Sequence, residues 1–274
     1  QMHELKLAAL SLVDRLSEKP DSEVIRAAIE KLRERARDDL RRGPRHISET
    51  LAQYMLTGRK PRAPLGLKAL DPLRVTAGDL CVLAARPGQG KTAMLGTIAL
   101  AAARAGWQAL FFSLEMPASE IQDRMIASLS GLAMDDVIRK DAADINRIAD
   151  AVDELSAMPI WLEDEGDGST AQLSLESIAA FVRLFAELYP DRQTVVLVDY
   201  LQRVRTKARY EKRYELIGHV CKGLKDAAKQ ARVPIIVGAQ LGRGVEQRGK
   251  NSAPQLSDLR ESGDIETNAD QIVL

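Results

Sequence analysis

Short apolar runs alternate with amphipathic stretches from Gly66 to the end of the chain. Brief apolar runs bounded by glycine, proline or charged residues are typical of buried strands. They occur at Leu80–Ala84, Ala109–Leu114, Ile160–Glu163, Thr194–Asp199, Pro234–Ala239 and Gln271–Leu274. Between them, apolar residues at helical spacing predict helices at residues 91–106, 118–130, 142–157, 174–189 and 211–231. This alternation favours an α/β fold with a mostly parallel central sheet flanked by helices.

The pattern before Gly66 is different, because it is helical throughout. Apolar stripes predict helices at residues 4–16 and 22–42, and Gly43-Pro44 is a strong stop signal. A short striped helix at 47–56 precedes the basic, proline-containing stretch G-R-K-P-R-A-P, which reads as a linker. We therefore predict a helical N-terminal segment at 1–45, a linker helix with a basic linker at 46–64, and an α/β domain at 65–274.

Composition narrows the classes of function. The chain has 274 residues with 39 basic and 39 acidic side chains, so any nucleic-acid surface must be local. Cys81 and Cys221 lie in apolar or helical patterns without metal-ligand spacing, which indicates buried thiols in a reducing, cytoplasmic setting. No apolar run reaches membrane-spanning length. The chain starts at Gln1 and stops within a strand-like Q-I-V-L, which suggests a fragment.

The stretch A-A-R-P-G-Q-G-K-T has the context of a phosphate-binding loop, because a buried strand precedes it and a helix follows it. Glycines let backbone N–H groups turn toward phosphate oxygens, and the helix N-terminus adds partial positive charge. Lys91 is expected to reach the β- and γ-phosphates of ATP, and Thr92 to place its hydroxyl on Mg²⁺. Ala85 replaces the first glycine of the usual pattern, which costs little if its φ stays negative. The expected nucleotide-binding residues are Arg86, Pro87, Gly88, Gln89, Gly90, Lys91 and Thr92.

Three polar residues end other predicted strands, and the carboxyl ends of parallel strands meet at one edge of a sheet. Asp199 ends T-V-V-L-V-D and is expected to hold Mg²⁺ directly or through water. Glu115 follows F-F-S-L and is a candidate for the group that activates the attacking water, although a solvated strand end would look the same. Gln240 ends I-I-V-G-A-Q and could sense the γ-phosphate or simply be a polar strand end.

Two segments beside this edge are basic. R-V-R-T-K-A-R carries cations at alternate positions, which share a face in an extended loop and suit a phosphate backbone. These residues are Arg203, Arg205, Lys207 and Arg209. L-G-R-G-V-E-Q-R-G-K-N-S-A-P follows Gln240 and is rich in glycine and positive charge. A solvated loop is the commoner explanation of such a run.

Four motifs occur in a fixed order: A-A-R-P-G-Q-G-K-T, F-S-L-E-M-P, V-D-Y-L-Q and S-D-L-R-E-S-G-D-I-E. Together they resemble the C-terminal motor domain of DnaB-type replicative DNA helicases, over roughly residues 47–274. That resemblance implies a RecA-like P-loop fold and a hexameric ring. The family also tends to carry alanine at the position of Ala85, so the missing glycine supports the resemblance. D-L-R-E-S-G is the most diagnostic motif, because a generic P-loop ATPase has no reason to carry it.

The resemblance also implies residue roles. Lys91 and Thr92 would bind ATP·Mg²⁺, Asp199 would be the Walker-B acid, Glu115 the catalytic base, and Gln240 the link between γ-phosphate and DNA. The family's DNA-binding loop falls on Arg260, Glu261 and Gly263, and its other channel-facing loop falls on 203–209. The helix at 47–56 matches the linker helix that docks on the neighbouring subunit. The family's arginine finger lies beyond the point that matches Leu274, and its globular N-terminal domain is not recognisable in 1–45.

We therefore expect an ATP-dependent DNA helicase motor that moves along single-stranded DNA in replication, with a primase or a helicase loader as a further partner and no membrane association. Two alternatives stay open. One is a RecA-like recombinase or regulatory ring that does not unwind DNA, against which D-L-R-E-S-G argues. The other is an ATP-binding paralogue that serves as an interaction module, against which the intact Lys91, Thr92, Glu115 and Asp199 argue. A small-molecule kinase is less favoured because no lid or substrate motif is found.

Overall fold

The central element is a six-stranded sheet. The computed structural model describes residues 47, 51, 60–140, 143–164, 173–242, 253–259 and 262–274. The strands are β1 (Leu80–Ala85), β2 (Gln108–Ser113), β3 (Ile160–Asp164), β4 (Thr194–Asp199), β5 (Ile235–Gln240) and β6 (Gln271–Val273). They lie in the order β3-β2-β4-β5-β1-β6, and every pair is parallel. The prediction of a mostly parallel sheet is confirmed, with strand ends within one or two residues of those expected.

Helices connect the strands. The five long helices are α4 (Lys91–Arg104), α5 (Ala118–Ser130), α7 (Ile145–Ala157), α8 (Leu175–Leu188) and α9 (Arg213–Ala231). Two short helices were not predicted, α6 (Met134–Arg139) and α11 (Ser262–Asn268), because fewer than two turns give no readable periodicity. The 3₁₀ turns η1 (Lys68–Leu70), η2 (Leu201–Arg203) and η3 (Leu256–Asp258) were also unforeseen.

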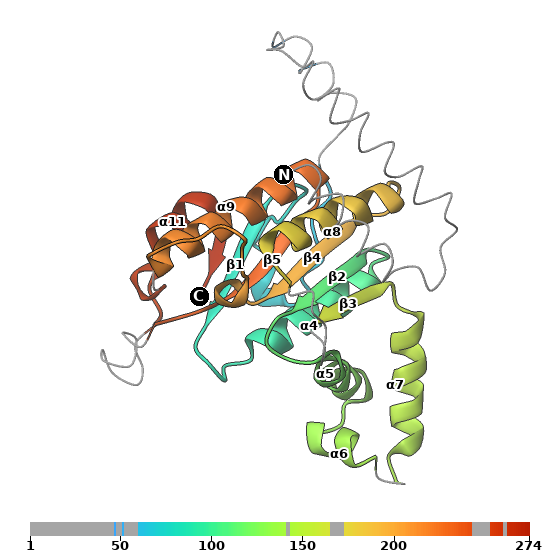
Figure 1. The fold of residues 1–274 in the computed structure, drawn as a ribbon. Helices are drawn as coiled ribbons and strands as arrows, with labels where there is room; N and C mark the ends of the chain where they lie inside the picture. Colours follow the sequence, from blue (N-terminus) through green and yellow to red (C-terminus); the bar gives the residue numbers. More distant parts are fainter. Residues whose placement is uncertain are drawn as a thin grey trace.

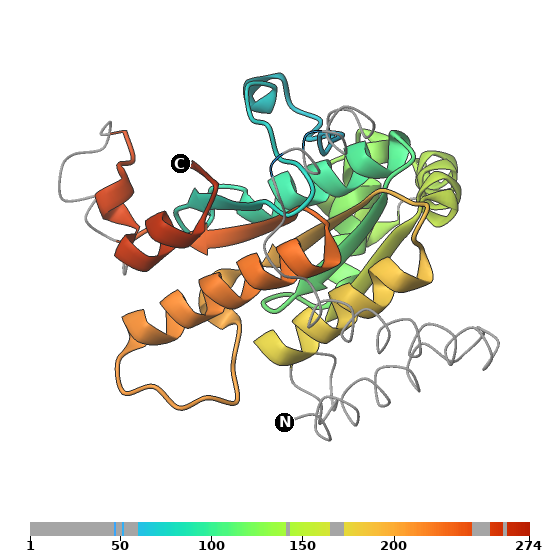
Figure 2. The ribbon, with the colours of Figure 1, turned by 90° about the horizontal axis from the view of Figure 1, so that it is seen from above.

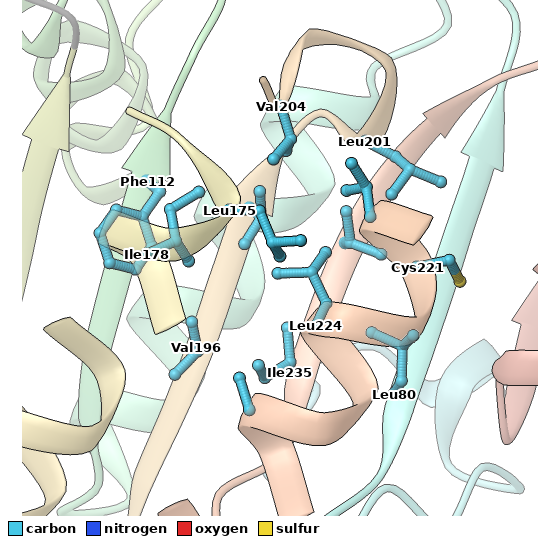
Figure 3. Close-up of a cluster of buried hydrophobic side chains, with 14 of the residues drawn as sticks. Leu80, Phe112, Leu175, Ile178, Val196, Leu201, Val204, Cys221, Leu224 and Ile235 are labelled. Carbon is cyan, nitrogen blue, oxygen red and sulfur yellow. The ribbon is translucent and has the colours of Figure 1, made fainter. Parts of the chain in front are cut away.

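The helices form a layer on each face of the sheet (Figures 1 and 2). One layer consists of α8, α9 and α11, and Figure 3 shows its packing, where Ile178 of α8 and Leu224 of α9 face Phe112, Val196 and Ile235 of the sheet. The other layer is built on α4 and α5, whose Leu95, Ile98 and Ile121 pack against the opposite sheet face. Helices α6 and α7 extend from α5 beside β3 (Figure 1). Burial on both faces explains why β2 and β4 read as continuous apolar runs.

Little of the predicted N-terminal part can be compared with the structure. Ile47 and Leu51 are helical, as expected for the helix at 47–56, and their side chains are 68% and 55% exposed. The helices predicted at 4–16 and 22–42 lie outside the described residues, so the boundaries at 45 and 64 stay predictions. Within the described part of the chain, no helix is long and apolar enough to cross a membrane.

The amino ends of β1 and β6 are joined to α9 by one carboxylate. Asp270 Oδ2 accepts hydrogen bonds from the Leu80 N–H at 2.7 Å and from Lys225 Nζ at 2.5 Å. Lys225 Nζ also donates to the Gly78 carbonyl at 2.7 Å. This contact therefore links β6 to both β1 and α9.

We predict that Asp270→Ala lowers the free energy of unfolding by about 1–3 kcal/mol, because it leaves the buried Leu80 N–H without its acceptor and the Lys225 ammonium with only the Gly78 carbonyl. Urea unfolding followed by circular dichroism measures the change. Asp226→Ala, which removes an exposed carboxylate on α9, is the matched control and should change stability by less than about 0.5 kcal/mol. Equal stability of the two variants would contradict this role.

Candidate functional site

Strand register brings the predicted site residues to one edge of the sheet. Ala85, which ends β1, is paired with Gln240, which ends β5. Ser113, which ends β2, is paired with Asp199, which ends β4, and the Leu114 N–H donates to the Asp199 carbonyl at 2.8 Å. Glu115 follows two residues after Ser113 at the same edge. The loop at residues 86–90 and the N-terminus of α4 lie at this edge because they follow β1 directly.

The loop before α4 has the backbone that anion binding requires. Gly88 and Gly90 have φ values of 77° and 82°, in the region that favours glycine. Helix α4 begins after Gly90 with no side-chain cap and no acidic residue in its first turn, so no side chain of the helix itself neutralises its partial positive charge. Ala85 does not have a positive φ, so its methyl group fits without strain in an ordinary strand conformation.

The side chain of Lys91 lies at the centre of the site, with 8% of its surface exposed. Its Nζ is 3.1 Å from Asp199 Oδ1 and 3.7 Å from Glu115 Oε2. The Nζ also lies 3.6 Å from the centroid of the Tyr200 ring, a cation–π contact. One ammonium therefore faces two carboxylates and an aromatic ring, and a phosphate entering the loop would provide a competing anionic partner.

Asp199 is the most buried charged residue of the site, with no exposed surface. Its Oδ2 accepts a hydrogen bond from the Thr92 hydroxyl at 2.5 Å. Its Oδ1 lies within ion-pair distance of Lys91 but has no aligned hydrogen-bond donor. A hydroxyl beside a buried carboxylate with an unsatisfied oxygen fits Mg²⁺, which takes oxygen ligands and keeps several from water and phosphate. In the described residues no cluster of three His, Cys, Asp or Glu could hold a metal by itself.

Two residues of this site were missed by the sequence analysis. Gly238 in β5 leaves room for Lys91, since an added Cβ would lie 2.8 Å from Lys91 Cδ. A glycine inside a strand often marks such a close approach, so V-G-A-Q carried a readable signal. The side-chain amide of Gln202 in η2 forms two hydrogen bonds with the main chain of Gln240. Gln202 Oε1 accepts from the Gln240 N–H at 3.1 Å, and Gln202 Nε2 donates to the Gln240 carbonyl at 3.3 Å. No local sequence pattern indicates that second contact.

A cavity of about 130 Å³ opens beside Thr92, between α4 and α5. Its lining is mostly apolar with a few polar groups. The lining residues are Thr92, Ala93, Gly96, Thr97, Leu100, Ile121, Arg124, Met125 and Ser128. Only Thr92 of this set was predicted as a site residue, because the pocket depends on how two helices pack.

The basic loop after β4 is exposed at all four predicted cations, whereas Val204 between them is buried. Arg203 closes the 3₁₀ turn η2, so the loop is not extended along its whole length. Farther along, the Arg205 carbonyl accepts from the Leu175 N–H at 2.7 Å. Burial tends to raise the pKa of the Glu176 carboxyl, but hydrogen bonds from the Thr206 hydroxyl and the Lys207 N–H outweigh it, and the pKa is lowered. The ionised Glu176 thus holds the middle of the loop against α8.

The other predicted DNA-binding segment is only partly described. Arg260 and Glu261 lie outside the described residues, and Gly263 is exposed in α11. The preceding residues are fixed, since Leu259 is buried and the Asp258 carbonyl accepts from the Gly242 N–H at 2.7 Å.

Both cysteines, Cys81 and Cys221, are buried free thiols, as the sequence predicts. Burial raises the pKa of each thiol to about 12, so neither forms a thiolate near neutral pH. A reactive-thiol function is therefore unfavourable at either position.

Comparison with known proteins gives consistent matches. Residues 64–274 match the family described as DnaB-like helicase C terminal domain. The replicative DNA helicase DnaB of Leifsonia xyli subsp. xyli is 33% identical over 233 residues, which is 83% of this chain and 49% of that protein. A solved structure described as an ATPase domain superposes with a TM-score of 0.75 at 29% identity, covering 84% of this chain and 83% of the other.

A second solved structure, of a DnaB-like replicative helicase described with its interactions with primase, gives a TM-score of 0.74 at 26% identity. It covers 99% of this chain and 64% of that one. These matches confirm the RecA-like ATPase fold expected from the motifs. The chain spans about half the length of the curated relatives it matches.

Gly238→Ala tests the packing of Lys91. We expect the added methyl to displace the Lys91 side chain and to weaken binding of a fluorescent ATP analogue about tenfold, the equivalent of one charge-assisted hydrogen bond. Fluorescence titration measures the affinity, and thermal melting checks the fold. Asp226→Ala is the control, because it changes an exposed side chain on α9, a helix that takes no part in the site. Unchanged affinity in Gly238→Ala would show that Lys91 does not need this space.

Proposed function

Because the chain belongs to the DnaB-like helicase C-terminal domain family, we propose that it is the ATP-driven motor of a replicative DNA helicase and moves along single-stranded DNA. One observation carries this proposal: Lys91, Thr92, Glu115 and Asp199 converge beside the uncapped N-terminus of α4. No single one of these residues is specific, but their convergence at the carboxyl edge of a parallel sheet is what phosphoryl transfer from a nucleotide requires.

We assign the phosphates of ATP to the loop from Arg86 to Gly90. The N–H groups of that loop and of the first turn of α4 would cradle the β- and γ-phosphates. Lys91 would exchange its carboxylate partners for phosphate oxygens, which its flexible side chain permits. Thr92 and Asp199 would hold Mg²⁺, which when bound neutralises charge on the β- and γ-phosphates.

Hydrolysis in this proposal is positional and electrostatic. Glu115, with 35% of its side chain exposed, can reach a water that enters from solvent and can orient it or take its proton. That water attacks the γ-phosphorus while the bond to the β-phosphate oxygen breaks, giving ADP and inorganic phosphate. Lys91 stabilises the charge that develops on the phosphoryl oxygens. Gln240, at the end of β5, is assigned to sensing the γ-phosphate.

We further propose that the cavity between α4 and α5 holds the nucleoside part of ATP. It begins at Thr92, so a nucleotide whose phosphates fill the loop would place its sugar or base there. Ile121 and Met125 offer apolar contact, while Arg124, Thr97 and Ser128 offer polar groups.

The DNA surface in this proposal combines both predicted segments. Arg203, Arg205, Lys207 and Arg209 are exposed beside the nucleotide edge and would contact the phosphate backbone. Arg260, Glu261 and Gly263 follow Leu259, whose burial fixes where that segment starts. Backbone contacts of this kind bind without sequence preference, as a translocating motor needs.

A homo-oligomeric ring, most simply a hexamer, is part of the proposal. Ile145 and Val152 are exposed seven residues apart on one face of α7, and Ile138 of α6 is 57% exposed. The exposed Ile47 and Leu51, at i and i+4, offer a matching apolar stripe. We propose that this stripe of one subunit packs on α6 and α7 of the next. A primase or helicase loader is a further proposed partner, and a cytoplasmic location goes with the replicative role.

Binding of single-stranded DNA tests the proposed function. We expect the wild-type chain to bind a fluorescent oligonucleotide more tightly with a non-hydrolysable ATP analogue than with ADP, and to lose affinity steeply with salt. Lys91→Ala should abolish the difference between nucleotides. Arg260→Ala should weaken binding in both states and reduce the salt slope by about 1. Fluorescence anisotropy across a salt series measures all three.

Arg104→Ala is the control for lost charge, since Arg104 pairs with Glu154 at 2.8 Å at the far end of α4. It should bind DNA as the wild type does. If the wild-type chain binds the analogue but no DNA in any nucleotide state, the motor assignment fails and the interaction-module alternative gains support.

Ring assembly has its own test. We expect Val152→Asp to raise the concentration needed for oligomers at least about tenfold, because it places an unpaired charge in an apolar interface. Leu51→Asp should have the same effect from the other side. Sedimentation velocity with bound analogue measures the oligomeric state, and Asp153→Asn, at an exposed neighbouring position on α7, is the control. Normal assembly of both Val152→Asp and Leu51→Asp would refute the proposed contact.

A further inference from the structure

The last residue of β5 and the two residues after it are hydrogen-bonded to residues that shortly precede each of the three segments assigned above to nucleotide and DNA. Gln240 is bonded through its main chain to Gln202, which directly precedes the basic loop. The Leu241 N–H donates to the Ala85 carbonyl at 3.0 Å, one residue before the phosphate loop. The Gly242 N–H donates to the Asp258 carbonyl at 2.7 Å, two residues before Arg260. Residues 240–242 thus form a hydrogen-bonded junction between these segments.

The contact with Gln202 replaces a missing part of the sheet. Pairing between β4 and β5 covers Val196 to Val198 opposite Ile235 to Val237 and stops there. Strand β4 ends at Asp199 and turns into η2, while β5 continues to Gln240. The Gln202 amide then supplies one acceptor and one donor to the main chain of Gln240, on the side where β4 has left. The Gln202 side chain thereby satisfies the Gln240 N–H and carbonyl, which a neighbouring strand would otherwise satisfy.

The η2 turn is held firmly on its other side. Leu201 and Val204 are 0% and 2% exposed and pack in the core with Leu175 and Leu224 (Figure 3). Gln202 lies between these two anchors, and Arg203 follows it. A shift of the Gln240 main chain would therefore act on the first residue of the basic loop through two hydrogen bonds, with the buried leucine and valine as a fixed support.

We propose that Gln202 is a positioning residue that couples the end of β5 to the basic loop at residues 203–209, so that the nucleotide state sensed at Gln240 changes the affinity of the loop for a nucleic-acid backbone. The inference rests on the proposed function, because it assumes that the site binds nucleotide and that the loop binds DNA. Of the links made by residues 240–242 to the two DNA-binding segments, that to Gln202 runs through a side chain, so substitution can remove it without altering the backbone.

The test measures coupling, defined as the ratio of single-stranded DNA dissociation constants with ADP and with a non-hydrolysable ATP analogue. Gln202→Met removes both hydrogen bonds at nearly constant volume. Gln202→Glu keeps an acceptor for the Gln240 N–H but sets a carboxylate oxygen against the Gln240 carbonyl. Gln230→Met makes the same exchange at an exposed position near the C-terminal end of α9, away from the site. Analogue affinity without DNA and thermal melting are recorded for each chain.

We expect the coupling ratio to fall about fivefold or more in Gln202→Met, within the usual range of coupling between sites. Analogue affinity without DNA should change less than about twofold, because the two hydrogen bonds of the Gln202 side chain go to the main chain of Gln240. Gln202→Glu should be intermediate, and Gln230→Met should match the wild type. If Gln202→Met does not fold, Gln202→Glu decides, and a wild-type ratio in it refutes the proposal.

Three other results would overturn the inference. An unchanged ratio in both Gln202 variants would show that coupling runs elsewhere while the proposed function stands. An equal loss of DNA affinity in both nucleotide states would show a purely structural role. A wild-type chain without nucleotide-dependent DNA binding would remove the proposed function itself, and the inference with it.

Discussion

The site depends on the register of a parallel sheet. Pairing Ala85 with Gln240 and Ser113 with Asp199 brings the ends of β1 and β5, and of β2 and β4, to one edge of the sheet. The carboxylates of Asp199 and Glu115, from distant parts of the sequence, thereby meet around one ammonium. A slip by one residue would turn the side chains of a strand to the opposite face of the sheet. In β2, for example, Phe112 packs against one helix layer and Phe111 against the other, and a slip would exchange these two environments. The packing of the two cores therefore fixes the geometry of the chemistry, although no core residue takes part in it.

The electrostatics of the site follow from that register. Lys91 is almost wholly buried beside Asp199, and desolvating two charges costs free energy that their attraction and the Thr92 hydrogen bond must offset. Gly238 lacks a side chain, and this leaves the space that the Lys91 side chain occupies beside β5. The arrangement is thus a closed set of ion pairs, and the proposed phosphate and Mg²⁺ would redistribute these partners without requiring a new fold.

Most of the fold and the centre of the site could be predicted from the sequence, for a physical reason. Buried parallel strands and their crossover helices leave local patterns, and Lys91, Thr92, Glu115 and Asp199 sit at fixed offsets from strand ends. The residues that were missed depend on contacts without local signature. Gln202 reaches a backbone 38 residues away, and the cavity beside Thr92 exists because α4 and α5 pack at a particular distance. Helix α6 was missed because six residues are too short to show periodicity.

The helix layers on the two faces of the sheet carry different parts of the proposed machinery, and these parts meet at the carboxyl edge of the sheet. The layer of α4 and α5 carries the phosphate loop, the cavity and the exposed apolar surface of α6 and α7. The layer of α8, α9 and α11 anchors the basic loop through Leu201, Val204 and Glu176. In the proposed function, a change that starts at the nucleotide reaches the loop at this edge, because segments from both layers meet at the carboxyl ends of the strands. The ladder between β4 and β5 ends at Val198 and Val237, and the Gln202 amide continues the hydrogen bonding on the Gln240 main chain. A shift at this edge therefore involves two side-chain hydrogen bonds and not the ladder itself.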